Sequence, residues 1–479
     1  MNGNIKEYIR KIPFLFNFIK WVIKSTIYRP ALRDAAANIL GRWFPGLIGL
    51  RCWLAHQYAL DGAQAQAKAI ADSILATDPD SHVYLTLAPI YYLQGRFEDA
   101  LNAMRRGEEK RHEYANQQQL DKLKLRIFSS RSFKAMGHAG LIDIFIKGQI
   151  LGILDECHNI ILGETKYFAN LAFIKYYEKY CSLITEKKTV DHILSFSYPI
   201  EEHLAMIKCR DQRLLTLAEF GREVQLRWEA ESRPALLELT AEHRQSGYKL
   251  LHELGMPEGA WFCGLHVREG SDQMRAIRNS NIDTYDLAIE EIVRRGGWVI
   301  RMGDPSMRPL RPRANVIDYI HSGRRQDWMD VFLWAEGRFF LGTGSGPVVL
   351  PLCFGKGTAI ANWAPLASRQ WSKDDILLPK QYWLESEKRF LTMEERMSSK
   401  YGYHESANAL DELGVAVVDN SPEEIVDLVV EMLERIDGTV VYTDSQRQAQ
   451  QRFAEISNQG SMYPSLIARG FINRYPELF

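Results

Sequence analysis

The sequence has no excess of charge of either sign. Its 59 lysine and arginine residues are balanced by 60 aspartate and glutamate residues, for a net charge of −1. Because nucleic-acid binding depends on a basic surface, the composition gives no support for a nucleic-acid partner. No apolar run approaches the roughly eighteen residues of a membrane span, and no signal-peptide cleavage site follows the start.

Cysteine is scarce, and metal-binding patterns are missing. The six cysteines are single and mostly lie in apolar runs, which predicts reduced thiols in a cytoplasmic protein: Cys52, Cys157, Cys181, Cys209, Cys263 and Cys353. No histidine and cysteine cluster has zinc-ligand spacing. The one Asp-x-Asp triplet, Asp78-Pro79-Asp80, lies far from the motifs described below. The sequence therefore predicts no metal site and no cofactor.

Residues 1–30 form an amphipathic segment in which apolar residues alternate with cations. The apolar set includes Phe14, Phe18 and Trp21, and the cations include Lys20 and Lys24. Such a helix most often docks on a neighbouring domain. The alternative is peripheral contact with the inner face of a membrane, where cations are attracted to anionic lipid.

Residues 31–125 contain an internal repeat. Leu54, Ala55, Tyr58, Gly62 and Ala67 recur 33 residues later as Leu87, Ala88, Tyr91, Gly95 and Ala100. Small residues where two helices cross, followed by a tyrosine and a turn glycine, are typical of tetratricopeptide (TPR) repeats. The region is therefore predicted to be helical. It serves either as a docking surface for a protein partner or as a cap that shields the next domain.

Two regions in which short strands and helices alternate follow the repeats. Strands are predicted at 126–129, 159–162 and 182–185 in the first region, and at 261–267, 298–302, 316–319, 338–341, 358–361 and 415–418 in the second. Such alternation favours parallel sheets in an α/β fold. The sequence predicts two Rossmann-like domains, at 126–254 (with bridging helices from about 211) and 255–440, followed by C-terminal helices at 441–479.

The strongest local motif is Gly342-Thr343-Gly344-Ser345-Gly346. A buried strand ends there and a helix is predicted to begin, so glycine would let the backbone approach an anion that the helix N-terminus attracts. Thr343 and Ser345 could add hydroxyl donors to a phosphate. The alternative is a glycine-rich turn with a serine cap. The motif matches neither a Walker loop nor GxGxxG, so an ATPase or dehydrogenase has no support.

Polar residues also follow two other strands of the second region. His266-Val267-Arg268-Glu269 ends the first strand, at the edge where open parallel sheets bind ligands. Arg268 could neutralise a diphosphate, or could form an ion pair with Glu269 or Asp272. Gly303-Asp304 ends the next strand, where Asp304 either binds a sugar hydroxyl or fixes the turn.

Three side chains are candidates for a general base. His138, in Gly137-His138, follows the first strand of the first region and titrates in the useful range, although a lone histidine is more often a cap or a core residue. Glu269 and Asp330 are the rivals. Asp330 lies at a predicted helix start, where capping also explains it.

The second region resembles a family of bacterial glycosyltransferases from surface-carbohydrate gene clusters. The stretches that carry the resemblance include 265–268, 296–307, 316–319, 327–333, 338–343, 362–366 and 470–476. The family is similar in outline to fucosyltransferase-like enzymes with two Rossmann-like domains, the GT-B architecture. In those enzymes a strand-end arginine contacts the donor diphosphate, and the resemblance implies this role for Arg268.

The sequence therefore predicts a metal-independent glycosyltransferase. It would use a nucleotide-sugar donor and a glycan, lipid-linked or protein acceptor. The donor would bind at His266, Arg268, Gly303, Asp304 and Thr343 to Gly346, with catalysis by His138, Arg268 and Glu269. The alternatives are a non-catalytic TPR scaffold with a degenerate sugar-binding domain, and a pyruvyl-type transferase on a similar fold.

Overall fold

The computed structural model describes residues 48–479, apart from 61–62, 78, 94–95, 196–201, 203–205, 271–272, 367–371, 399, 403, 405–406 and 460–464. The predicted amphipathic segment 1–30 lies outside the described residues. The chain divides into two compact units, Met1–Gln117 and Gln118–Phe479. Within the described ranges, no helix combines the length and the apolar character that a membrane crossing requires.

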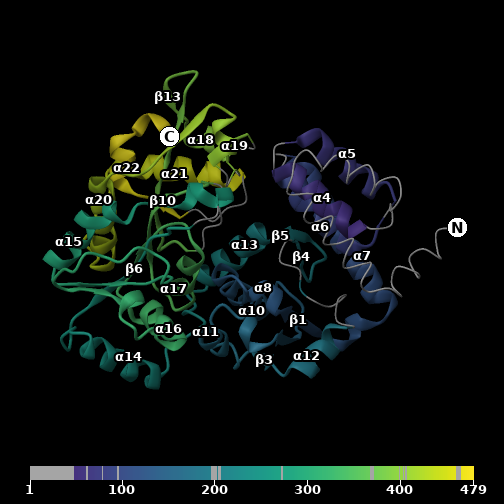
Figure 1. The fold of residues 1–479 in the computed structure, drawn as a ribbon, viewed down its shortest axis with the longest axis horizontal. Helices are drawn as coiled ribbons and strands as arrows, with labels where there is room; N and C mark the ends of the chain where they lie inside the picture. The colour runs from purple at the N-terminus through teal and green to yellow at the C-terminus, as the bar shows by residue number, and fades with distance from the viewer. Residues whose placement is uncertain are drawn as a thin grey trace. The chain divides into compact units, whose positions relative to one another are not determined.

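The described part of the first unit, from residue 48 on, consists of helices around a core of its own (Figure 1). These are α4 (Ile48–Leu60), α5 (Gln64–Leu75), α6 (Ser81–Leu93) and α7 (Phe97–Gln117). The described residues of the repeat are all buried, which is why they are small or apolar: Leu54, Ala55, Tyr58, Ala67, Leu87, Ala88, Tyr91 and Ala100. The region is helical as predicted, whereas its identity as TPR repeats stays a prediction.

The second unit begins with a three-stranded parallel sheet in the order β1-β2-β3. Its strands are β1 (Leu125–Ser129), β2 (His158–Leu162) and β3 (Cys181–Ile184), each within a residue or two of the predicted range. The helices that connect or follow these strands are α8 (Ser130–Phe133), α9 (Met136–Ala139), α10 (Leu141–Ile150), α11 (Leu171–Lys175) and α12 (Lys187–Leu194). An unpredicted antiparallel hairpin, β4 (Met206–Lys208) with β5 (Leu214–Thr216), leads into α13 (Leu217–Ala230) and α14 (Ala241–Glu253).

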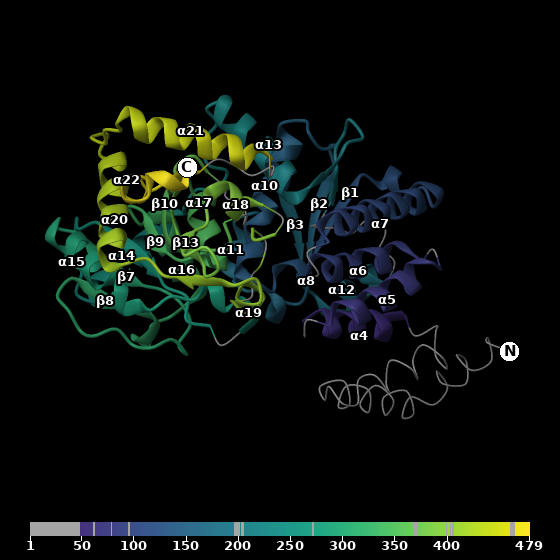
Figure 2. The same cartoon turned by 90° about the horizontal axis from the view of Figure 1, so that it is seen from above.

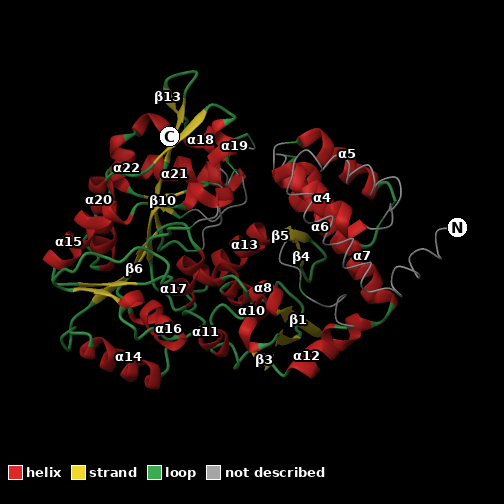
Figure 3. Ribbon diagram, viewed as in Figure 1, coloured by secondary structure: helices red, strands yellow, loops and turns green. Residues whose placement is uncertain are grey.

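A seven-stranded, all-parallel sheet forms the centre of this unit (Figure 3). Its order is β15-β11-β10-β9-β6-β7-β8. The bounds are β6 (Phe262–His266), β7 (Trp298–Arg301), β8 (Val316–Asp318), β9 (Phe340–Gly342), β10 (Thr358–Trp363), β11 (Ile376–Pro379) and β15 (Leu466–Ile467). The chain runs outward from β6 through β7 to β8 and then returns to β9 on the other side of β6. The sheet therefore has a topological switch point between β6 and β9, which is where open α/β sheets bind ligands.

Three of the predicted helices of this region are present at the expected places. They are α15 (Asp286–Arg294), α16 (Asp327–Glu336) and α20 (Pro422–Ile436), and α15 lies beside α20 (Figures 1 and 2). The α20 cap is the expected capping box: the Ser421 hydroxyl accepts a hydrogen bond from the Glu424 amide, and the Glu424 carboxylate accepts one from the Ser421 amide. Pro422 at the first helical position also favours a helix start here, because its fixed φ suits a helix and its missing N–H is not needed.

The chain after β11 departs from the predicted pattern. The predicted strand Val415–Val418 (β14) joins no parallel sheet but a small antiparallel one with β12 (Gln381–Leu384) and β13 (Arg389–Phe390), which α18 (Met393–Met397) and α19 (Ala407–Asp411) accompany. The segment 441–479 holds the helices α21 (Asp444–Gln459) and α22 (Arg469–Arg474), as predicted. It also contributes β15 to the edge of the large sheet.

Helix α18, which packs beside the small sheet, contains an arginine that is buried without a counter-ion among the described residues. The Arg396 side chain is fully buried, and its guanidinium lies 4.8 Å from the centre of the Tyr382 ring. None of its three nitrogens has a hydrogen-bond partner among the described residues. Burial lowers the pKa of Arg396 to about 10. A buried, unpaired charge opposes folding, because the lost hydration is not replaced.

We therefore expect Arg396→Met to raise the stability of the protein. Methionine keeps the length and apolar contacts of the side chain, and replacing buried ionic groups with apolar ones has been neutral or stabilising by up to about 4 kcal/mol. The matched control is Arg389→Met, because Arg389 is half-buried and its charge is paired with Glu395; there we expect a small loss of stability. Thermal unfolding of the two variants measures both effects. A lower melting temperature for Arg396→Met would show that the guanidinium has a stabilising partner.

Candidate active site

The candidate site lies at the carboxyl ends of β6 and β9, on the two sides of the switch point. His266 of β6 is in register with Gly342 of β9, so the residues that follow each strand meet. The His266 carbonyl accepts a hydrogen bond from the Thr343 amide (3.2 Å), and the Thr343 hydroxyl accepts one from the Arg268 amide (3.0 Å). The Thr343 hydroxyl thus fastens the two strand ends to each other.

Among the described residues, the groups that hold Arg268 are neutral. Its carbonyl accepts a hydrogen bond from the Ser280 amide (3.0 Å), and its Nε donates one to Asn279 Oδ1 (3.1 Å). The side chain is half-buried and forms no ion pair with any carboxylate in the part of the chain that the structure describes. The predicted alternative of an ion pair with Glu269 is not what the structure contains, and Asp272 lies outside the described residues. The arrangement leaves a positioned guanidinium ready for an anion.

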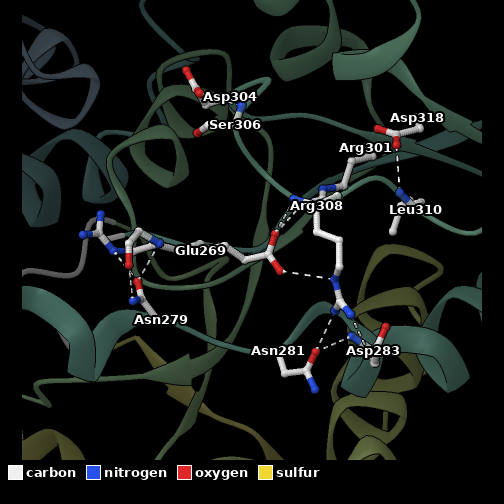
Figure 4. Close-up of polar contacts among 12 residues, drawn as sticks. Glu269, Asn279, Asn281, Asp283, Arg301, Asp304, Ser306, Arg308, Leu310 and Asp318 are labelled. Carbon is white, nitrogen blue, oxygen red and sulfur yellow. Dashed lines mark hydrogen bonds and ion pairs between the residues drawn. The ribbon is translucent and has the colours of Figure 1, made fainter. Parts of the chain in front are cut away.

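The Glu269 carboxylate belongs to a different network. Its Oε2 lies 3.2 Å from Arg301 Nη2 and accepts a hydrogen bond from the Arg308 amide at 3.2 Å (Figure 4). Arg301 is fully buried and also donates to the Arg308 carbonyl (3.1 Å). Glu269 supplies the counter-charge of this buried guanidinium, and its removal would leave the Arg301 charge unpaired. Its position explains a structural role, and its predicted part in catalysis stays a prediction.

Asp304 fixes a turn beyond β7. Its Oδ1 accepts a hydrogen bond from the Ser306 amide (2.9 Å), and hydrogen bonding to Ser306 lowers the pKa of Asp304 (Figure 4). Gly303 before it has φ of +146°, and a Cβ there would lie 2.6 Å from Met307 Sδ, so the turn requires glycine. The side chain is exposed at this edge of the sheet, and contact with a sugar hydroxyl stays a prediction.

Ser345 of the glycine-rich loop is paired with His266. Its Oγ lies 3.0 Å from His266 Nδ1, and both side chains are buried. Burial, together with the charges of Arg301 and Arg268, lowers the pKa of His266 to about 4. The imidazole is therefore neutral at pH 7 and acts as a hydrogen-bonding partner of Ser345 rather than as a cation.

The helix after this loop is shorter than predicted. A 3₁₀ helix, η7 (Gly346–Val349), leads into α17 (Leu350–Cys353), which is a single α-helical turn. Proline at 347 and at 351 removes two backbone donors, which explains why no long helix forms. A helix dipole therefore contributes less to anion binding than the sequence predicted, and the positive charge beside the loop comes from arginine side chains, Arg268 and Arg278.

The glycine-rich loop touches the segment that carries His138. A Cβ added at Gly137 would lie 2.9 Å from Gly346 Cα, and one added at Gly346 would lie 2.6 Å from the Gly137 nitrogen. Such distances are too short for any side chain at either position. His138 is exposed beside this contact. The two predicted motifs, 137–138 and 343–346, are thus brought together from the two parallel sheets.

This contact gives a stability prediction for Gly137→Ala. Alanine is the better helix former by about 1 kcal/mol, so the change would stabilise α9 if the position were open. The contact with Gly346 instead forces the backbone apart, and we expect a net loss of about 1–3 kcal/mol together with weaker ligand binding. Gly49→Ala in α4 is the control, because no described residue lies within 4 Å of its added Cβ. A more stable Gly137→Ala protein would contradict the close contact.

Side chains that the sequence did not single out complete the site. Asn279 Oδ1 also accepts from the Gly270 amide (3.1 Å), and the buried Lys380 Nζ donates to the Asn279 carbonyl (2.7 Å) while pairing with Asp419 (2.6 Å). Arg278 Nε donates to the Gly344 carbonyl (2.7 Å). These bonds hold the Arg268 guanidinium and the glycine-rich loop in place.

Asn362 connects this segment to the end of β10. Its side chain donates to Ser280 Oγ (2.8 Å) and accepts from the Asn420 amide (2.7 Å), and its backbone is left-handed with φ of +53°. Asparagine tolerates that conformation better than most residues do. Asn362 lies in the stretch 362–366 that resembles the glycosyltransferase family. That resemblance was the sequence feature from which a role for Asn362 could have been predicted.

Asp330, a candidate base, is buried near the start of α16. Its Oδ2 lies 3.8 Å from Arg325 Nε, and burial raises its pKa from 3.8 to about 7. Within the described ranges, no group of three or more histidine, cysteine or acidic side chains is placed to hold a metal ion.

Neither the known protein-family models nor the curated proteins give a match to this chain. Several solved structures are similar to it. A glycosyl transferase family 9 protein from Veillonella parvula is 12% identical with a TM-score of 0.41, covering 65% of this chain and 97% of its own.

The dodecameric iron-containing heptosyltransferase TibC, in complex with ADP-D-beta-D-heptose, is 12% identical with a TM-score of 0.39, covering 65% of this chain and 77% of its own. The E. coli ADP-heptose lipopolysaccharide heptosyltransferase II is 10% identical with a TM-score of 0.38, covering 65% and 99%.

Proposed function

We propose that this chain is a glycosyltransferase that moves a sugar from a nucleotide-sugar donor to a hydroxyl group of a glycan, lipid-linked or protein acceptor in the synthesis of bacterial surface carbohydrate. The observation that carries the proposal is Arg268. It is a half-buried guanidinium at the switch point of a parallel sheet, oriented by Asn279 and without a carboxylate partner among the described residues. A diphosphate is the anion that such a forked donor fits best.

The departing nucleoside diphosphate would be stabilised by residues of the second parallel sheet. As the bond between the sugar and the diphosphate breaks, negative charge grows on the leaving oxygen, and a fixed cation stabilises that charge more than it stabilises the ground state. Arg268 supplies the charge without a metal, and the backbone of Gly344 and Gly346 permits close approach. Neutral His266 would orient the Ser345 hydroxyl toward the same group.

The acceptor would be activated from the other sheet. His138 follows Gly137, whose backbone touches Gly346, so its imidazole is carried by the segment that meets the glycine-rich loop. A neutral imidazole there would take the proton of the acceptor hydroxyl as that oxygen attacks the anomeric carbon. Glu269 and Asp330 are the alternatives. Glu269 has a structural reason for its place, the ion pair with Arg301, whereas Asp330 is buried in α16 with a raised pKa and caps no helix.

The first test is thermal unfolding in the presence of candidate donors. The panel is GDP-, UDP-, CMP-, ADP- and dTDP-sugars, with phosphoenolpyruvate included for a pyruvyl-type transferase. A ligand at a hundred times its dissociation constant adds about 2.7 kcal/mol of stability, which is easily detected. We expect one nucleotide class to stabilise the protein. Stabilisation by phosphoenolpyruvate alone, or by no compound for a folded protein, would overturn the proposal.

A further inference from the structure

The loop that follows β6 is closed by one asparagine. Asn279 comes directly after the 3₁₀ helix η4 (Gln273–Arg278), and its side chain binds the backbone of Gly270 through both of its polar atoms. Oδ1 accepts a hydrogen bond from the Gly270 amide (3.1 Å), and Nδ2 donates one to the Gly270 carbonyl (2.7 Å). The Asn279 carbonyl accepts one from the ammonium group of the buried Lys380 (2.7 Å). The side chain and the backbone of Asn279 are therefore both held in place.

These hydrogen bonds fix which way the Asn279 amide points. Its oxygen accepts from two donors, the Gly270 amide and Arg268 Nε (3.1 Å). With the oxygen and nitrogen exchanged, the NH₂ group would face both of these donors and the oxygen would face the Gly270 carbonyl. Asn279 therefore meets Arg268 as a hydrogen-bond acceptor, and as a neutral one.

The Arg268 guanidinium is held along one edge and open at its other end. Asn279 occupies Nε, and a Cβ added at Gly270 would lie 3.0 Å from Nη2 and 3.3 Å from Cζ, so the guanidinium packs against the Gly270 backbone. Within the described residues, Nη1 and Nη2 form no hydrogen bond, and neither belongs to the buried nitrogens that lack a partner. An anion can therefore reach Arg268 end-on, at the two Nη nitrogens, rather than along the Nε edge.

A neutral partner leaves the charge of Arg268 uncompensated. A carboxylate at position 279 would form an ion pair with the guanidinium and compete with an anionic ligand for it. The opposite arrangement occurs two residues further on. Asn281 Oδ1 also accepts from an arginine, Arg308 Nη2 (3.0 Å), but Arg308 Nη1 pairs with the Asp283 carboxylate at 3.0 Å (Figure 4). The charge of Arg308 is thus already balanced, whereas that of Arg268 is kept for a ligand.

We propose that Asn279 is a positioning residue for the donor diphosphate. It would hold Arg268 by Nε, so that the two Nη nitrogens donate to two oxygens of the diphosphate, and it would do so without cancelling the charge that binds them. The inference rests on the proposed glycosyltransferase function, since it specifies how the same site holds the leaving group. It also makes a separate claim, namely that Asn279 acts through Arg268 and must be neutral.

The test compares four variants with the wild type: Asn279→Ala, Asn279→Asp, Arg268→Gln, and Asn279→Ala combined with Arg268→Gln. Calorimetry measures the binding of GDP, UDP, ADP and dTDP, and of the four corresponding nucleosides. The matched controls are Asn281→Ala and Asn281→Asp, which make the same exchanges next to an arginine that already has a carboxylate partner. Melting temperatures establish that each variant is folded.

We expect Asn279→Ala to bind the nucleoside diphosphate at least about fivefold more weakly than the wild type, because Arg268 loses the bond that orients it. Asn279→Asp should lose more than the alanine variant, because its carboxylate pairs with Arg268. The nucleoside should bind all variants equally, and the controls should bind the diphosphate within about threefold of the wild type. In the Arg268→Gln background, Asn279→Ala should cause no further loss, since the residue through which Asn279 acts is already gone.

Wild-type diphosphate binding by Asn279→Ala would overturn the inference. The same fold-loss from Asn279→Ala in both backgrounds would also overturn it, because Asn279 would then act on the loop and not through Arg268. Binding by Asn279→Asp that is as strong as that of the alanine variant would refute the need for a neutral partner.

If the variants at position 279 do not fold, Gly270→Ala decides. Its added methyl group displaces the Arg268 Nη2 nitrogen and keeps the backbone bonds to Asn279, so unchanged diphosphate binding would overturn the inference. A wild type that binds none of the four nucleoside diphosphates would instead overturn the proposed function, and this inference with it.

Discussion

Arg268→Ala is expected to lower kcat/KM by about 10²–10³-fold, the usual loss when one preorganised group that stabilises transition-state charge is removed. The protein should stay folded, because the contacts that fasten this segment are made by the Arg268 backbone, to Thr343 and Ser280, and are kept in the variant. Arg268→Lys should recover only part of the loss. A lysine has no forked pair of donors and cannot reproduce the Nε bond to Asn279.

The measurement is the initial rate with the donor that the nucleotide panel identifies. Arg311→Ala is the control, since Arg311 is an exposed arginine of the same sheet edge that pairs with Asp286. Its activity should be within about twofold of the wild type. Wild-type activity in a folded Arg268→Ala protein would remove the central residue of the proposed mechanism.

Asp330→Asn is expected to change how stability depends on pH. The folded-state pKa of Asp330 is raised from 3.8 to about 7, so between those values the folded protein retains a proton that the unfolded chain has released. Stability is therefore lost as pH rises through this window and stays low above it. A neutral asparagine avoids that loss. The variant should exceed the wild type by about 1 kcal/mol near pH 4.5 and by roughly 3–4 kcal/mol near pH 8.

Denaturant unfolding at the two pH values tests this expectation. Asp327→Asn is the matched control, because Asp327 is exposed at the start of the same helix, and its effect should be small at both values. A stability difference for Asp330→Asn that does not grow with pH would show that the carboxyl group is ionised in the folded protein. The same variant separates the candidate bases, since it should remain active if His138 accepts the proton.

Local features of the chain made much of the α/β architecture predictable. The strands β6 to β10 are short apolar runs bounded by glycine, asparagine and helix starts. The helix cap at Ser421 and Pro422 could be predicted from four consecutive residues. The strands β11 and β15 were missed. β15 has only two residues and is a strand because it lies beside β11, which no local pattern encodes.

The candidate site, too, was predictable from the sequence only in part. Arg268 and the glycine-rich loop were predictable, because the carboxyl ends of parallel strands meet at one edge. The side chains that pair with the residues of this site were not predictable. Lys380 reaches the Asn279 carbonyl from 101 residues away, and Glu269 pairs with Arg301 from 32 residues away rather than with its neighbour Arg268. Such pairs depend on how the strands are ordered in the sheet, and a strand order is a property of the whole fold.

The most direct test of the central claim is calorimetric binding of a nucleoside and of its diphosphate to the wild type and to Arg268→Gln. The nucleoside and the diphosphate are those of the donor that the panel identifies. If Arg268 holds the diphosphate, the variant should bind the nucleoside diphosphate at least tenfold more weakly, a loss of about 1.4 kcal/mol or more, and bind the nucleoside unchanged. Equal binding of the diphosphate by the two proteins would contradict the account.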